Sequence, residues 1–186
     1  SPAAEVGCNT FLLEKGSELG GLASLISKIP AKNRLADFPH YLMHRAEQLE
    51  NLYIFTNTEG TPENIRKFHP NIIVSSTGSA PLLPPITGLK DRIDNEDYNI
   101  YSILGMINHI NDFPKDLEGK KVVVVGGGAV GLDVVEFFAD RNADISIVEM
   151  MDQIGRDLDP VSKNDTKAMM KKHNVHQLPN SDGHFP

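Results

Sequence analysis

The sequence lacks features that several classes of protein need. Cys8 is its single cysteine, so the chain can form no internal disulfide, C-x-x-C redox pair or cysteine metal cluster. The formal net charge is −7, which disfavours a nucleic-acid partner and an anionic membrane surface, because both need a basic face. No apolar run approaches the length of a transmembrane helix. These absences favour a reducing, cytoplasmic compartment and partners other than nucleic acids or membranes.

Metal-binding patterns are also scarce. His40 and His44 are four residues apart on a predicted helix, but no third ligand is evident, and zinc sites need three or four. His173 and His176 straddle a helix end, so they share no regular face. We therefore predict no metal site and no side chain with a catalytic role in this chain.

Strand and helix signals alternate along the chain, which predicts an α/β fold. Apolar runs indicate three strands in the first half, over residues 9–13, 53–57 and 71–76, the last of them buried. Apolar spacing predicts a helix over 34–52, which Pro39 interrupts. Thr61 followed by Pro62 predicts the start of another helix.

A proline-rich segment marks the predicted domain boundary. "GSAPLLPPITG", residues 78–88, has three prolines in eleven residues and cannot form a regular helix. We interpret it as an extended linker and expect two domains, residues 1–90 and 91–186. Helical spacing in "YSILGMINHIND", residues 101–112, belongs to the second.

The strongest signal is "KKVVVVGGGAVGLDVVEFFADRNADISIVEM", residues 120–150. Its four consecutive valines, 122–125, predict a central parallel strand covered on both faces. Gly126, Gly128 and Gly131 then fit G-x-G-x-x-G. In a dinucleotide site the first glycine permits the tight turn, the second lets a pyrophosphate approach the backbone, and the third lets the helix pack closely on the strand.

The context of this glycine motif strengthens the prediction. A helix follows it, and the next strand, "ADISIVE", ends at Glu149, 18 residues after Gly131. An acid at that place binds ribose hydroxyls in NAD sites. The predicted nicotinamide-dinucleotide site is formed by Gly126, Gly127, Gly128, Ala129, Val130, Gly131 and Glu149. Two alternatives stay open, a glycine-rich turn that binds nothing and a nucleoside-methyltransferase site.

A second acid ends an earlier strand. Glu14 follows the apolar run 10–13 and precedes a glycine-containing loop, as at the end of the second strand of a dinucleotide-binding βαβ unit. The first strand and its glycine turn would lie about 20 residues earlier. Only 13 residues precede Glu14, and they contain one glycine. The sequence therefore predicts half of a second site.

Three stretches resemble the two-dinucleotide flavoproteins, in the order that this superfamily has them. "GKKVVVVGGGAVGLDVVEFFADRNADISIVE" is similar to the nicotinamide-binding domain, "IIVSSTGSAPLLPPITG" to the segment that crosses from the FAD domain to the NAD domain, and "FLLEKGSELGG" to the FAD-ribose strand. "YLMH", "EMMDQIGRDLDP" and the lack of a redox cysteine pair resemble one branch, the NADH:flavin oxidoreductases of the 2,4-dienoyl-CoA reductase and trimethylamine dehydrogenase type.

This resemblance implies a Rossmann-like parallel sheet with flanking helices, in two partial dinucleotide-binding domains. It implies NAD(H) in the second domain and FAD beside Glu14, Thr77 and Gly78 in the first. The family's first FAD strand has no counterpart here, nor does its barrel, which carries FMN and an iron–sulfur cluster. We therefore expect a fragment of a larger enzyme whose other parts are its partners.

The expected function follows from the resemblance. In the intact enzyme this region would pass hydride from NADH to FAD, and the fragment alone would be inactive. The alternative is a non-catalytic NAD(H)-binding module that acts as a sensor or docks to a partner; the length of the parent reading frame separates the two. Apolar strand surface left uncovered in the first domain favours formation of a homo-oligomer.

Overall fold

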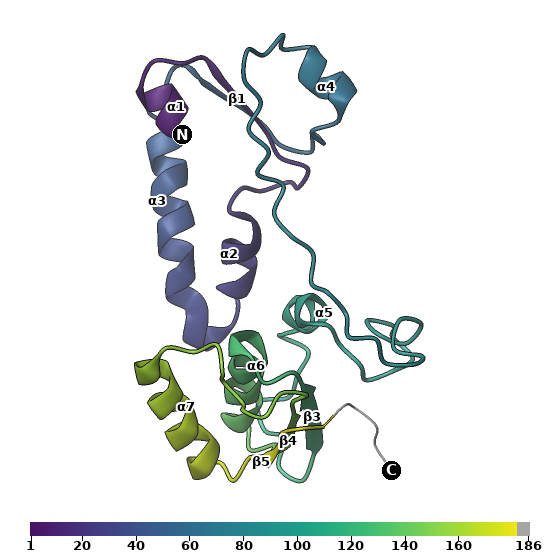
Figure 1. The fold of residues 1–186 in the computed structure, drawn as a ribbon. Coiled ribbons are helices and arrows are strands. Elements are labelled where there is room, and N and C mark those ends of the chain that lie inside the picture. Colours follow the sequence, from purple (N-terminus) through teal and green to yellow (C-terminus); the bar gives the residue numbers. More distant parts are fainter. Residues whose placement is uncertain (182–186) are drawn as a thin grey trace. The chain divides into compact units, whose positions relative to one another are not determined.

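A computed structural model describes residues 1–181 of the chain. The chain divides into two compact units, Ser1–Ala80 and Pro81–Pro186, which we call the N-terminal and the C-terminal unit. Both combine helices with parallel strands (Figure 1), which confirms the predicted α/β fold with parallel sheets and flanking helices.

The N-terminal unit is built around one pair of parallel strands. β1 (Thr10–Leu13) pairs with β2 (Leu52–Phe55), with Thr10 opposite Leu52. The helices are α1 (Pro2–Glu5), α2 (Gly21–Ile26), the 3₁₀ helix η1 (Pro30–Ala36), α3 (Asp37–Ala46) and α4 (Pro62–Arg66). The connection between the two strands contains α2, η1 and α3, because parallel strands cannot be joined by a tight turn.

Two helix starts in this unit follow from their residues. The predicted helix over 34–52 is shorter than expected: α3 ends at Ala46, and the residues before it form η1. Pro39 lies in the first turn of α3, where its missing N–H leaves no hydrogen bond broken. α4 begins after Thr61, whose side chain accepts a hydrogen bond from the Asn64 amide at 3.2 Å, as its sequence predicts.

The predicted buried strand over residues 71–76 is wrong. This segment forms no strand, and Ile72, Ile73 and Val74 are 81%, 63% and 79% exposed. β-branched side chains favour extended backbone, but a strand also needs a neighbour that pairs with its N–H and C=O groups. Among residues 1–181 no strand pairs with this segment, so it remains extended and exposed.

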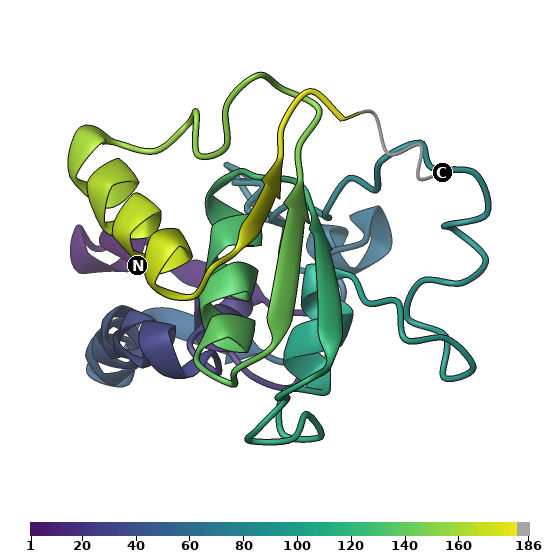
Figure 2. The same ribbon diagram turned by 90° about the horizontal axis from the view of Figure 1, so that it is seen from below.

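The C-terminal unit contains a three-stranded parallel sheet with the order β3-β4-β5. Its strands are β3 (Lys121–Val125), β4 (Asp144–Val148) and β5 (His176–Leu178), and its helices are α5 (Ile103–Asn108), α6 (Ala129–Ala139) and α7 (Pro160–Lys172). α6 connects β3 to β4 and packs against both, and α7 connects β4 to β5 (Figure 2). This is the Rossmann-like β-α-β-α-β arrangement.

The core of this unit lies between α6 and the sheet. Val135 of α6 and Ile145 and Ile147 of β4 are almost completely buried. β3 differs from the prediction of a central strand covered on both faces, because it is an edge strand of the described sheet, and Val123 and Val125 are 53% and 48% exposed. β4 is the strand with neighbours on both sides.

Among residues 1–181, every helix is too short or too polar to span a lipid bilayer.

Candidate nucleotide-binding site

The turn between β3 and α6 has the geometry that its glycines permit. Gly126 follows β3 directly and has φ of +104°, a conformation that residues with a side chain rarely adopt. Its N–H donates to the Val148 carbonyl at 2.8 Å, which extends the sheet by one residue. Gly128 is the N-cap of α6 and has extended backbone. The chain thus passes from strand to helix within three residues.

Gly131 brings the helix close to this turn. A Cβ atom on Gly131 would overlap the carbonyl oxygen of Gly126, a backbone atom that no side-chain movement can displace. Any larger residue would push the first turn of α6 away from the end of β3. The close helix–strand contact therefore depends on glycine at this position.

Glu149 connects the end of β4 to the glycine turn. Its Oε2 accepts a hydrogen bond from the Gly127 amide at 2.6 Å, and its Oε1 accepts one from the Met151 amide at 2.7 Å. The acid and the glycine turn, which are 22 residues apart in the sequence, are thus in direct contact. Glu149 is half-buried, and both of its oxygens are held by the backbone.

The loop between β4 and α7 covers the same end of the sheet (Figure 2). The Gly155 amide in this loop donates to the Gly127 carbonyl at 2.7 Å. The loop and the glycine turn line an open cavity of about 430 Å³. It is lined by Gly127, Gly128, Glu149, Met151, Gln153, Arg156 and Asp157.

Not every residue of the predicted site lines this cavity. Gly127, Gly128 and Glu149 do, whereas Gly126 and Gly131 shape the turn beneath it. Ala129 and Val130 begin α6 and are exposed. The glycine motif gave no reason to expect Gln153 and Asp157, although the sequence "EMMDQIGRDLDP" directly after the strand-end acid contains both.

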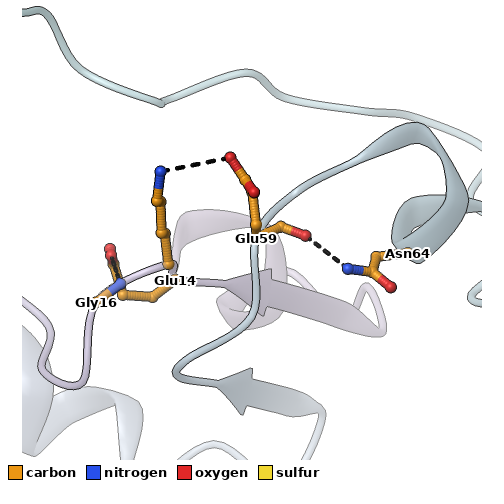
Figure 3. Close-up of polar contacts among 5 residues, drawn as sticks. Glu14, Gly16, Glu59 and Asn64 are labelled. Carbon is orange, nitrogen blue, oxygen red and sulfur yellow. Dashed lines mark hydrogen bonds and ion pairs between the residues drawn. The ribbon is translucent and has the colours of Figure 1, made fainter.

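In the N-terminal unit, Glu14 occupies a similar place at the end of β1. Its Oε1 accepts a hydrogen bond from the Gly16 amide at 2.6 Å, and its backbone pairs with Phe55 and Thr58. Figure 3 shows this contact beside an exposed ion pair, in which Lys15 Nζ lies 3.5 Å from Glu59 Oε1. Among residues 1–181, no strand-to-helix glycine turn donates a hydrogen bond to the Glu14 carboxylate as the Gly126–Gly128 turn does to Glu149.

The other two residues predicted to contact FAD are not joined to Glu14. Thr77 and Gly78 are exposed in the extended segment after residue 76, and no hydrogen bond within the described chain connects them to Glu14. A cavity of about 440 Å³ does exist in this unit, but it lies beside α2 and α3. It is lined by Glu18, Leu19, Ser24, Ser27, Ala36, His40 and Met43, and by none of the three predicted residues.

No group of three metal-binding side chains comes together in residues 1–181.

Comparison with known proteins places the chain in a family. A family model described as pyridine nucleotide-disulphide oxidoreductase matches residues 47–182. The NADH oxidase of Thermoanaerobacter brockii is 29% identical over 91% of this chain and 25% of its own length. The bilirubin reductase of Mediterraneibacter gnavus is 27% identical over 83% of this chain and 22% of its own.

Solved structures agree on the fold. A 2-naphthoyl-CoA reductase superposes with a TM-score of 0.75 at 24% identity, over 96% of this chain and 25% of that one. A histamine dehydrogenase from Rhizobium sp. 4-9 has a TM-score of 0.71 at 18% identity, over 95% of this chain and 28% of that one. The chain thus spans about a quarter of the length of these relatives. On the match to the family model over most of its length, the chain belongs to the pyridine nucleotide-disulphide oxidoreductase family, a family of oxidoreductases built on FAD- and NAD-binding Rossmann-type domains.

Proposed function

We propose that this chain is the nicotinamide-dinucleotide-binding part of a flavin oxidoreductase of the 2,4-dienoyl-CoA reductase and trimethylamine dehydrogenase type. In the intact enzyme it would bind NADH so that hydride passes to FAD. The relatives that support this proposal are an NADH oxidase and a bilirubin reductase, and each is about four times as long as the region they share with this chain.

The observation that carries the proposal is the contact between the glycine turn and Glu149 at the edge of the cavity. The residues fit a dinucleotide: Gly128 leaves backbone open to the cavity, and the first N–H groups of α6 have no partner within the helix. A pyrophosphate at this place would receive hydrogen bonds from those amides and the favourable helix dipole. The backbone contacts hold Glu149 at the cavity, where its carboxylate can accept from ribose hydroxyls.

The same carboxylate supports a preference for NADH. The extra phosphate of NADPH would lie on the ribose that Glu149 contacts, and two negative groups a few ångströms apart repel each other. Arg156 lines the cavity as well and is the nearby side chain that would offset this repulsion. We expect the carboxylate to dominate, because its two backbone hydrogen bonds hold it in place whereas Arg156 is exposed.

For the N-terminal unit we propose a partial FAD site at Glu14, Thr77 and Gly78. When bound, FAD supplies the hydride-accepting ring, and the protein orients it. Glu14 is at the end of a parallel strand, as the resemblance requires. FMN and an iron–sulfur cluster would belong to regions of the parent enzyme outside this sequence.

The test is direct titration of the chain with NADH and NADPH by isothermal calorimetry. We expect saturable binding of NADH and weaker binding of NADPH. Equal or tighter NADPH binding would disprove the proposed role of Glu149. If neither nucleotide binds at up to millimolar concentration, the nucleotide-binding function itself is wrong.

A further inference from the structure

The carboxylate of Asp157 lies at the N-terminal end of α6, at the place where the proposed function puts a pyrophosphate. Its Oδ2 is 3.4 Å from the Ala129 amide nitrogen, which makes a long hydrogen bond. The same oxygen would be 3.4 Å from a Cβ atom on Gly128, the glycine whose missing side chain leaves the backbone open. Asp157 also lines the cavity. The hydrogen bond to Ala129, the closeness to Gly128 and the place in the cavity lining together put this carboxylate in the proposed anion position.

This carboxylate forms no ion pair in the part of the chain that the structure describes. Arg156 is adjacent in sequence, but it is the Arg156 carbonyl that is engaged, accepting from Lys163 Nζ at 3.1 Å. The polar groups beside the Asp157 carboxylate are therefore the amide of Ala129 and the N-terminal end of α6. These are the groups that a pyrophosphate would use.

We propose that Asp157 is an internal competitor of the nucleotide. In the ligand-free chain its carboxylate occupies the anion position at α6, and it must leave before a nucleotide pyrophosphate can bind there. This inference rests on the proposed function and adds to it a residue that limits affinity.

The geometry permits such an exchange. Asp157 is exposed and belongs to a loop, and a 3.4 Å hydrogen bond is near the limit of the interaction, so rotating the side chain breaks little. The neighbouring backbone contact, from Gly155 to Gly127 at 2.7 Å, is short and keeps the loop in place when the side chain moves. A movement of the Asp157 side chain alone would therefore open the site.

The experiment compares Asp157→Asn with Asp152→Asn. Asp152 is in the same loop, is exposed and does not line the cavity, so the control makes the same change of charge at a neighbouring place. Asparagine keeps the size of the side chain and can still accept from Ala129. Calorimetric titration with NADH should give a dissociation constant about fivefold lower for Asp157→Asn, the size of a strong charge–dipole effect at a helix end. Asp152→Asn should stay within about 1.5-fold of the parent, because an exposed charge outside the cavity is largely screened.

A second measurement separates competition from a structural role. Without nucleotide, Asp157→Asn should melt at the same temperature as the parent or slightly lower, because a charge that favours the helix dipole is lost. Tighter binding together with unchanged or slightly lower stability indicates a competitor, whereas substitution of a structural residue would weaken both stability and binding. The gain in affinity should also shrink at 1 M salt, where charges are screened over about 3 Å.

The outcomes are distinguishable. If the parent binds NADH and Asp157→Asn binds it equally or more weakly, the inference is wrong and the proposed function stands. If neither the parent nor Asp157→Asn binds NADH, both are wrong. Saturable binding by the parent together with about fivefold tighter binding by Asp157→Asn supports both.

Discussion

Glu14 and Glu149 end parallel strands in the two units, and each accepts a hydrogen bond from the amide two residues later in the chain, at 2.6 and 2.7 Å. The difference lies in the second oxygen. In Glu149 it binds the Gly127 amide and so joins the acid to a glycine turn and a cavity. In Glu14 it meets no such turn among residues 1–181. We therefore expect a strand-end acid to contribute to a nucleotide site only where a glycine turn is brought to it, as at Glu149.

The largest expected difference between the units is in cofactor retention. We expect the purified chain to be colourless and to have no NADH oxidase activity, while it binds NADH in titration. A charged hydrogen bond from Glu14 contributes about 1.5–3 kcal/mol, whereas micromolar affinity for a flavin needs about 8 kcal/mol. The measurement is the visible absorbance spectrum of the protein as isolated. Flavin bands at about 370 and 450 nm would show that the N-terminal unit holds more of the site than its contacts indicate.

The next largest effect is expected from Gly128→Val. The branched side chain would fill the part of the cavity beside Asp157, so the affinity for NADH should fall at least about 100-fold, or about 2.7 kcal/mol. The far-ultraviolet circular dichroism should not change, because the backbone of Gly128 is extended, a conformation that valine readily adopts. Gly60→Val in the N-terminal unit is the matched control, since a Cβ there meets nothing within 4 Å. NADH binding by Gly128→Val at the affinity of the parent would mean that the pyrophosphate is not at this turn.

A smaller effect should separate the two acids directly. Glu149→Ala removes the ribose acceptor and leaves the amides of Gly127 and Met151 without their partner, so we expect NADH binding about tenfold weaker, near 1.4 kcal/mol. The difference in affinity between NADH and NADPH should also become smaller, because the carboxylate that repels the extra phosphate of NADPH is gone. Glu14→Ala should leave both affinities unchanged. If Glu14→Ala weakens NADH binding as much as Glu149→Ala does, the proposal that only Glu149 contacts the nucleotide is wrong.

The smallest expected effect concerns the helix caps of the two units. Hydrogen bonds from the Ser162 side chain and from the backbone amides of Ser162 and Val161 lower the pKa of Asp159, the N-cap of α7. A lowered carboxylate pKa adds stability above the unfolded value of about 3.9, and this contribution is lost as the pH falls through the lower folded value. The melting temperature of Asp159→Asn should therefore lie slightly below that of the parent at pH 7, and the difference should shrink as the pH falls below the unfolded pKa of about 3.9 and through the lower folded pKa.

Thr61 provides the comparison for that prediction. It caps α4 with a neutral hydroxyl, so Thr61→Ala should cost about 1 kcal/mol at every pH. A pH-independent difference between the parent and Asp159→Asn would contradict the role of the Asp159 charge.

The sequence predicted best where an element depends on its own residues. The turn at Gly126 and the helix starts at Thr61 and at Ala129 rest on local conformation or capping, and the structure has them. The predictions failed where an element depends on its neighbours. Residues 71–76 have strand-forming side chains but no pairing strand in the described chain, and the four valines of 122–125 form an edge instead of a centre.

Among the residues that line the cavity, too, those in a local sequence motif were predicted and those that depend on how a loop folds were not. Gly128 and Glu149 were identified because their motif has a fixed spacing, and the structure brings both to one cavity. Asp157 was missed because its place depends on how the loop after Glu149 folds back onto the turn, which no local pattern specifies.

The exposed segment 71–76 has a consequence for the behaviour of the chain at high concentration. Residues 70–89 contain no charged side chain, and residues 71–76 combine β-branched residues with an absence of proline. These are the properties of segments that assemble into cross-β fibrils. Pro70 directly precedes this run and Pro81 lies five residues after its end. Because proline cannot donate a ladder hydrogen bond, both limit how far intermolecular pairing can spread. Ile73→Lys would place a charge within this run, and it should therefore delay the onset of fibril growth without touching the nucleotide site.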